Sequence, residues 1–91
     1  MNETVLIIDN SSEHIDFLAE KIFKPDGYRV ITAQNTETGL KLTANTPPDL
    51  ILLPLDWVAV DGPVLRAAAP SAALIATAPH ESAVVTAQAF Q

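Results

Sequence analysis

The chain has 91 residues, room for one small domain, and hydrophobic and charged residues make up 48% and 18% of it. It contains no cysteine, which excludes disulfide scaffolds, thiolate metal sites and cysteine nucleophiles. A net charge of -6 and apolar stretches far shorter than the ~20 residues of a membrane helix argue against nucleic acid and membrane partners. No secretory signal is visible after Met1, so we expect a cytoplasmic protein.

The N-terminal segment reads as a strand followed by a helix. Residues Val5–Ile8 form a continuous apolar run, which is typical of a strand buried on both faces. Polar residues follow, and the spacing of Asn10 and Glu13 matches a capping box, which predicts a helix start. Apolar residues then recur at helical spacing over Ile15–Phe23, and Pro25 ends the pattern.

The same alternation continues through the middle of the chain. Residues Tyr28–Ala33 are rich in β-branched side chains and predict a second strand. Asn35–Thr38 resembles another helix start, although Gly39 should weaken this helix by about 1 kcal/mol relative to alanine. The breakers Asn45–Pro48 end it, and Leu50–Leu53 is the strongest candidate for a buried strand.

The last third predicts a loop over Trp57–Gly62, a short helix over Pro63–Ala69 and a fourth strand over Leu74–Thr77. The Ala-rich segment Glu81–Phe90 is compatible with a helix. Strands that alternate with helices imply right-handed crossovers and a parallel sheet. In such α/β folds, ligands and reactions sit at the carboxyl ends of the strands.

Several segments resemble a known family, the receiver domains of response regulators. Val5–Asn10 resembles the first strand and the acidic pair of the family, and Gly27–Val30 its second strand. Pro48–Leu53 is similar to the third strand and Asp61–Gly62 to the loop after it. Ala73–Ala78 resembles the fourth strand with its hydroxyl residue, so the resemblance covers nearly the whole chain.

The resemblance implies a three-layer, flavodoxin-like α/β sandwich with a parallel sheet of four strands in the order 2-1-3-4. The family's fifth strand and last helix are missing, so residues 1–91 are expected to be a single receiver-like domain, incomplete at its C-terminus. The fourth strand would then be a bare apolar edge, which favours a homodimer with Leu74 as a contact. Alternatively, the chain is a fragment of a longer receiver, or Ser82–Gln91 folds over this edge.

The resemblance also indicates where a phosphorylation site would lie. In the family, an aspartate at the end of the third strand accepts a phosphoryl group, with Mg2+ held by that aspartate and the acidic pair. Here Pro54 stands at the acceptor position, Asn10 replaces the second acidic residue, and the family's lysine after the fifth strand is absent. Only Asp9 and Thr77 remain, with Asp9 as a weak candidate Mg2+ ligand. Asp56, two residues beyond Pro54, is the alternative acceptor.

These departures predict a pseudo-receiver, a non-enzymatic module of a two-component phosphorelay that acts by protein–protein interaction without phosphorylation. One alternative is a Mg2+-dependent receiver that is phosphorylated on Asp56, and another is a structural fragment that only self-associates. Trp57 is a candidate partner contact or a lid packed on the domain. His14 and His80 are interpreted as surface residues, because their spacing suggests no metal pair.

Overall fold

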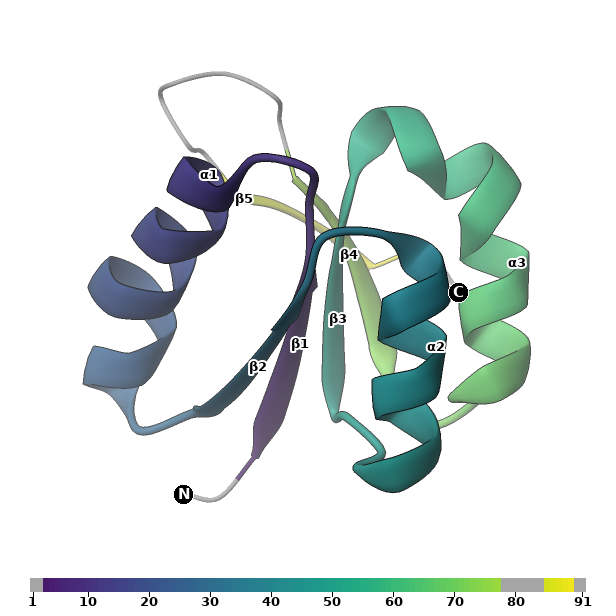
Figure 1. The fold of residues 1–91 in the computed structure, drawn as a ribbon, viewed down its shortest axis with the longest axis horizontal. Helices are drawn as coiled ribbons and strands as arrows, with labels where there is room; N and C mark the ends of the chain where they lie inside the picture. Colours follow the sequence, from purple (N-terminus) through teal and green to yellow (C-terminus); the bar gives the residue numbers. More distant parts are fainter. Residues whose placement is uncertain (1–2, 78–84, 90–91) are drawn as a thin grey trace.

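The computed structural model describes residues 3–77 and 85–89. They form one five-stranded sheet in the order β2-β1-β3-β4-β5 (Figure 1). The strands are β1 (Thr4–Ile8), β2 (Arg29–Ala33), β3 (Leu50–Pro54), β4 (Ala73–Thr77) and β5 (Val85–Ala89). The helices are α1 (Ser12–Phe17), its π-helical and 3-10 continuations η1 (Leu18–Phe23) and η2 (Lys24–Asp26), α2 (Thr36–Asn45), the 3-10 turn η3 (Leu55–Trp57) and α3 (Val58–Ala68).

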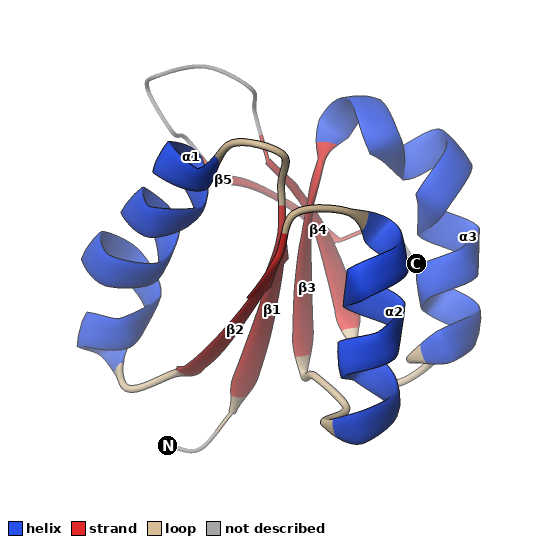
Figure 2. Ribbon diagram, in the orientation of Figure 1, coloured by secondary structure: helices blue, strands red, loops and turns tan. Residues whose placement is uncertain are grey.

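Strands β1 to β4 are parallel, and helices cover both faces of the sheet they form. Helix α1 lies on one face, and α2 and α3 lie together on the other (Figures 1 and 2). This arrangement confirms the predicted three-layer, flavodoxin-like α/β fold and the strand order 2-1-3-4. Parallel strands need crossover connections, and the helical segments found in the sequence supply them.

The side chains of β1 alternate between two hydrophobic cores, as the period of two in a strand requires. Val5 and Ile7 pack toward α1 and η1, whereas Leu6 and Ile8 pack toward α2 and α3. All four are buried, which explains why β1 reads as a continuous apolar run rather than an alternating one. Strand β1 is also paired on both sides, by β2 and β3, and its end places the loop that follows at the carboxyl edge of the sheet.

The C-terminal segment differs from the sequence prediction. Strand β5 pairs with β4 in the antiparallel sense, so β4 is not a bare edge and the sheet has five strands rather than four. The predicted helix over Glu81–Phe90 is wrong for residues 85–89, and the rest of that segment lies outside the described residues. An unpaired strand edge offers a row of backbone donors and acceptors, and pairing with it outweighs the local helix propensity of this Ala-rich segment.

This pairing also changes the expectation for Leu74. Its side chain is only 2% exposed and belongs to the core under α3. Leu74 therefore cannot serve as a contact on an exposed edge, and the homodimer that was expected through the fourth strand loses its surface. The predicted position of β4 beside β3 is confirmed, but the prediction that its other edge is exposed is wrong.

Two helix starts lie elsewhere than expected. Ser11, not Asn10, caps α1, because its hydroxyl accepts a hydrogen bond from the backbone N–H of His14. Helix α3 begins at Val58 and runs through Gly62, where a loop was predicted. Gly62 is buried where α3 faces the sheet, and a Cβ atom at this position would lie 3.4 Å from the side chain of Leu74, an ordinary packing distance.

Gly39 has a similar explanation inside α2. A Cβ atom at this position would lie 2.7 Å from Cδ1 of the buried Ile8, closer than atoms normally pack. The glycine weakens the isolated helix, but it allows α2 to approach the end of β1. The tertiary contact thus accounts for a residue that the helix alone would not favour.

Candidate functional site

The predicted site residues gather at the carboxyl edge of the parallel strands. Asp9 follows β1, and its backbone N–H donates to the carbonyl oxygen of Ala33 at the end of β2 (3.1 Å). Pro54 ends β3 and lies opposite Thr77, the last residue of β4. Because β1 pairs with β3, these strand ends are neighbours in the sheet. The fold thus brings Asp9, Pro54 and Thr77 to one edge, where α/β proteins bind their ligands.

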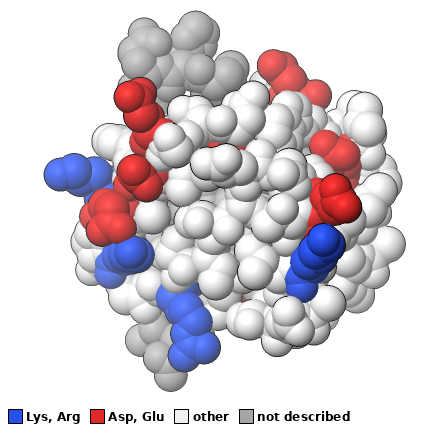
Figure 3. Space-filling view, viewed as in Figure 1, with Lys and Arg blue, Asp and Glu red and all other residues white. Residues whose placement is uncertain are grey.

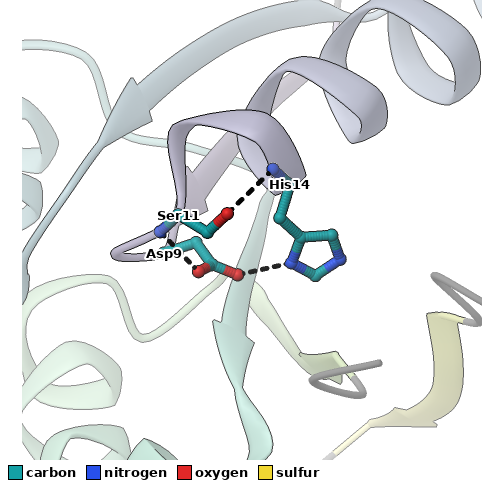
Figure 4. Close-up of polar contacts among 3 residues, drawn as sticks. All are labelled: Asp9, Ser11 and His14. Carbon is teal, nitrogen blue, oxygen red and sulfur yellow. Dashed lines mark hydrogen bonds and ion pairs between the residues drawn. The ribbon is translucent and has the colours of Figure 1, made fainter. Parts of the chain in front are cut away.

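Asp9 is buried, and the protein satisfies both of its carboxylate oxygens. Oδ1 accepts a hydrogen bond from the backbone N–H of Ser11 at 3.0 Å. Oδ2 lies 2.6 Å from Nδ1 of His14 (Figure 4). A carboxylate can only accept, so the imidazole donates its Nδ1 proton. Charge-assisted contacts of this length are among the stronger hydrogen bonds in proteins.

The position of His14 is the main site feature that the sequence did not reveal. Its side chain is 16% exposed and faces Asp9, so its interpretation as a surface residue is wrong, whereas His80 lies outside the described residues. His14 occupies the first turn of α1, where the Ser11 cap holds its backbone. The Ser11 cap was the only available signal, because it sets which residue of the first turn faces back toward Asp9.

The other predicted residues take no part in this network. Asn10 is exposed, and Thr77 is buried at the end of β4. Pro54 is half-buried with extended backbone angles, φ -55 and ψ 140. Asp56 is exposed in the turn η3. Trp57 is half-buried and packs against the core under α3, which favours the packed lid over the partner anchor.

The donor set does not fit Mg2+. This ion prefers an octahedral shell of oxygen ligands that includes one or two carboxylates. Asp9 already binds two protein donors, Asn10 offers an exposed amide, and Pro54 has no side-chain oxygen. Within residues 3–77 and 85–89, no group of three or more His, Cys, Asp or Glu side chains could hold a metal ion.

A shallow hollow of about 440 Å³ opens between the first turns of α1 and α2. Its lining is mostly polar and contains none of the site residues predicted from the sequence. The lining residues are Ser12, Ile15, Asp16, Thr32, Ala33, Gln34, Asn35 and Thr38.

On the face shown in Figure 3, charged side chains lie toward the two flanks, and the middle is largely uncharged. Among the described helices, none is long and apolar enough to cross a membrane.

The fold and the strand-end residues define a receiver-like α/β domain, the class of α/β folds that places its site at the carboxyl edge of a parallel sheet. No family model matches the chain. It is 34% identical over 62 residues to sporulation initiation phosphotransferase F of Bacillus subtilis (strain 168), a response-regulator receiver. The matched part is 68% of this chain and 49% of that protein, so the chain spans about half the length of its curated relative. The chain is therefore similar to a response-regulator receiver over about two thirds of its own length.

Proposed function

We propose that the chain is a non-enzymatic, cytoplasmic receiver-like module that acts by protein contact and without phosphorylation. The observation that carries this proposal is Pro54 at the carboxyl end of β3. An acyl phosphate needs a carboxylate at that strand end, and proline cannot supply one. The neutral, exposed Asn10 and the fully engaged Asp9 support the same conclusion.

The alternative acceptor, Asp56, lies beyond the end of β3. It is exposed in η3, whereas the candidate cation ligand Asp9 is buried after β1. Phosphoryl transfer depends on holding the acceptor and a divalent cation in a fixed mutual position. An exposed residue in a 3-10 turn, with no side-chain hydrogen bond among the described contacts, is a poor fit to that requirement.

The decisive experiment is the intact mass of the full chain after incubation with acetyl phosphate and Mg2+. We expect no phosphoryl adduct under conditions that modify an ordinary receiver run in parallel. Asp56→Ala is the matched control. An adduct that this substitution removes would contradict the proposal and establish Asp56 as the acceptor of a working switch. An adduct that persists in Asp56→Ala would contradict both the phosphorylation-independent module and the receiver that uses Asp56.

The contact surface that we propose is the outer side of α3. Val60 is 76% exposed and Val64 47% exposed, and Leu55 in the preceding η3 is 51% exposed. Together with the exposed Pro63 and Ala67, the valines form an uncharged stripe at the spacing i, i+3, i+4 and i+7. We call these four helical residues the α3 stripe. Scattered exposed apolar residues are common, but a continuous stripe is typical of an interaction surface.

A second copy of the chain is the occupant that we propose for the α3 stripe. The net charge of -6 makes copies repel one another, and this repulsion is weakest at a face that carries no charge. A stripe two helical turns long is small beside the about 800 Å² per partner of a stable interface. We therefore expect a weak dimer that forms at tens of micromolar.

Sedimentation of the full chain tests this contact. We expect Val60→Lys to shift the chain to monomer, because it places a charge in the middle of the stripe. Gln34→Lys adds the same charge to an exposed loop outside the stripe and should leave the dimer intact. A wild-type monomer at tens of micromolar, or a dimer that survives Val60→Lys, would overturn the proposal for α3.

A further inference from the structure

The contact between Asp9 and His14 has an unusual setting for a histidine. His14 lies in the first turn of α1, where the helix dipole disfavours a positive charge. The helix by itself gives no reason for an imidazole at this position. The Asp9 carboxylate does give one, because it lies 2.6 Å from Nδ1 and is only 9% exposed in its side chain.

Three hydrogen bonds hold this contact in a closed ring. The Ser11 N–H donates to Asp9 Oδ1, the Ser11 hydroxyl accepts from the His14 N–H, and His14 Nδ1 donates to Asp9 Oδ2 (Figure 4). The distances are 3.0, 3.2 and 2.6 Å. The Ser11 cap sets where α1 begins, and this start places His14 in the first turn. From there its imidazole contacts the Asp9 carboxylate. Both oxygens of the Asp9 carboxylate therefore have protein donors.

We propose that the Nδ1–H of His14 takes the place of a divalent cation as the fixed partner of Asp9. The inference rests on the proposed function, since a module that is not phosphorylated has no need of Mg2+ at this strand end. A buried carboxylate still has to be satisfied, because burying a charge without a hydrogen-bond partner is strongly unfavourable. His14 satisfies it permanently, so the turn after β1 keeps one conformation whether or not Mg2+ is present.

Amide spectra of the full-length, 15N-labelled chain test the cation part of the proposal. Mg2+ is added to concentrations that saturate an ordinary magnesium site. We expect the amide signals of Asp9, Ser11 and His14 not to move. Saturable shifts confined to these amides would mean that Mg2+ displaces the imidazole, and would overturn the inference.

A double-mutant cycle between Asp9→Asn and His14→Phe tests the pairing, with phenylalanine chosen to keep the ring and remove the donor. Each single variant should lower the unfolding midpoint by several degrees. Asp9→Asn should have little further effect in the His14→Phe background, because its partner has already gone. Additive losses would overturn the inference. Glu13→Gln, an exposed neighbour in the same turn, is the control and should change neither result.

The wild-type chain alone provides a test if a variant fails to fold. Nitrogen spectra of the His14 ring should show a proton on Nδ1, since that atom donates to Asp9. A ring protonated only at Nε2 would overturn the pairing. These measurements need no phosphoryl donor. A phosphoryl adduct with an intact Asp9–His14 pair would therefore contradict the proposed function and leave the pairing in place.

Discussion

The turns after β1 and β3 begin at neighbouring strand ends and are held by different forces. After β1, a buried carboxylate organises the chain through hydrogen bonds to Ser11 and His14. After β3, Pro54 fixes the backbone and Trp57 packs on the core, and no side-chain cap holds η3. One turn depends on direction-specific polar contacts, and the other on a restricted dihedral angle and apolar packing.

The difference shows how a strand-end site can change its chemistry and keep its fold. Proline has no backbone N–H, so it leaves no donor without a partner at the end of a strand. A proline in place of a polar residue there therefore creates no buried, unsatisfied polar group. A carboxylate kept at the buried end of β1 does need partners, and the protein provides them from α1. The two turns therefore respond differently to substitution.

The largest expected effect is that of Asp9→Ala. It removes the acceptor of two hydrogen bonds and leaves Ser11 N–H and His14 without their partner, so we expect a loss of about 2–4 kcal/mol in the free energy of unfolding. Asp56→Ala, in the turn after β3, should change it by less than about 0.5 kcal/mol. Urea denaturation measures both. Similar losses for the two variants would contradict the difference between the turns.

Gly39→Ala should have an intermediate effect at the same end of β1. The added Cβ would meet Ile8 at 2.7 Å, and overpacking of this kind costs about 1–3 kcal/mol, against about 1 kcal/mol gained in helix propensity. We expect a net loss of about 1 kcal/mol. The variant Ile8→Val lacks the clashing Cδ1 atom, so Gly39→Ala should become neutral or stabilising in that background. A loss that is unchanged there would place its cause elsewhere.

The smallest effect concerns the helix caps. Ser11→Ala and Asn35→Ala each remove a cap, and a cap is worth about 1 kcal/mol. We expect Ser11→Ala to cost more than Asn35→Ala, because the Ser11 hydroxyl also holds the residue that closes over Asp9. Thermal unfolding compares the two, with the exposed Ser12→Ala as a control. Equal losses would show that the ring around Asp9 does not depend on its cap.

The failures of sequence-based prediction share one physical origin, long-range contact. The alanines of Glu81–Phe90 favour a helix locally, yet residues 85–89 pair with β4 because that edge needs a partner. Gly62 reads as a loop residue, yet it lies in α3, a helix that packs on the sheet through the buried Leu65. Local propensities amount to about 1 kcal/mol or less per residue, and a paired strand or a packed helix outweighs them.

The sequence by itself determined the strand order 2-1-3-4, the apolar β1 and β3, and the proline that ends β3. These features follow from periodicity, from residue type and from the resemblance to receiver domains, all of which can be read without coordinates. The pairing of Asp9 with His14, the covered edge of β4 and the exposed stripe on α3 depended on the tertiary structure. They depend on how a capped helix and a sheet orient side chains toward one another, which spacing along the chain does not specify.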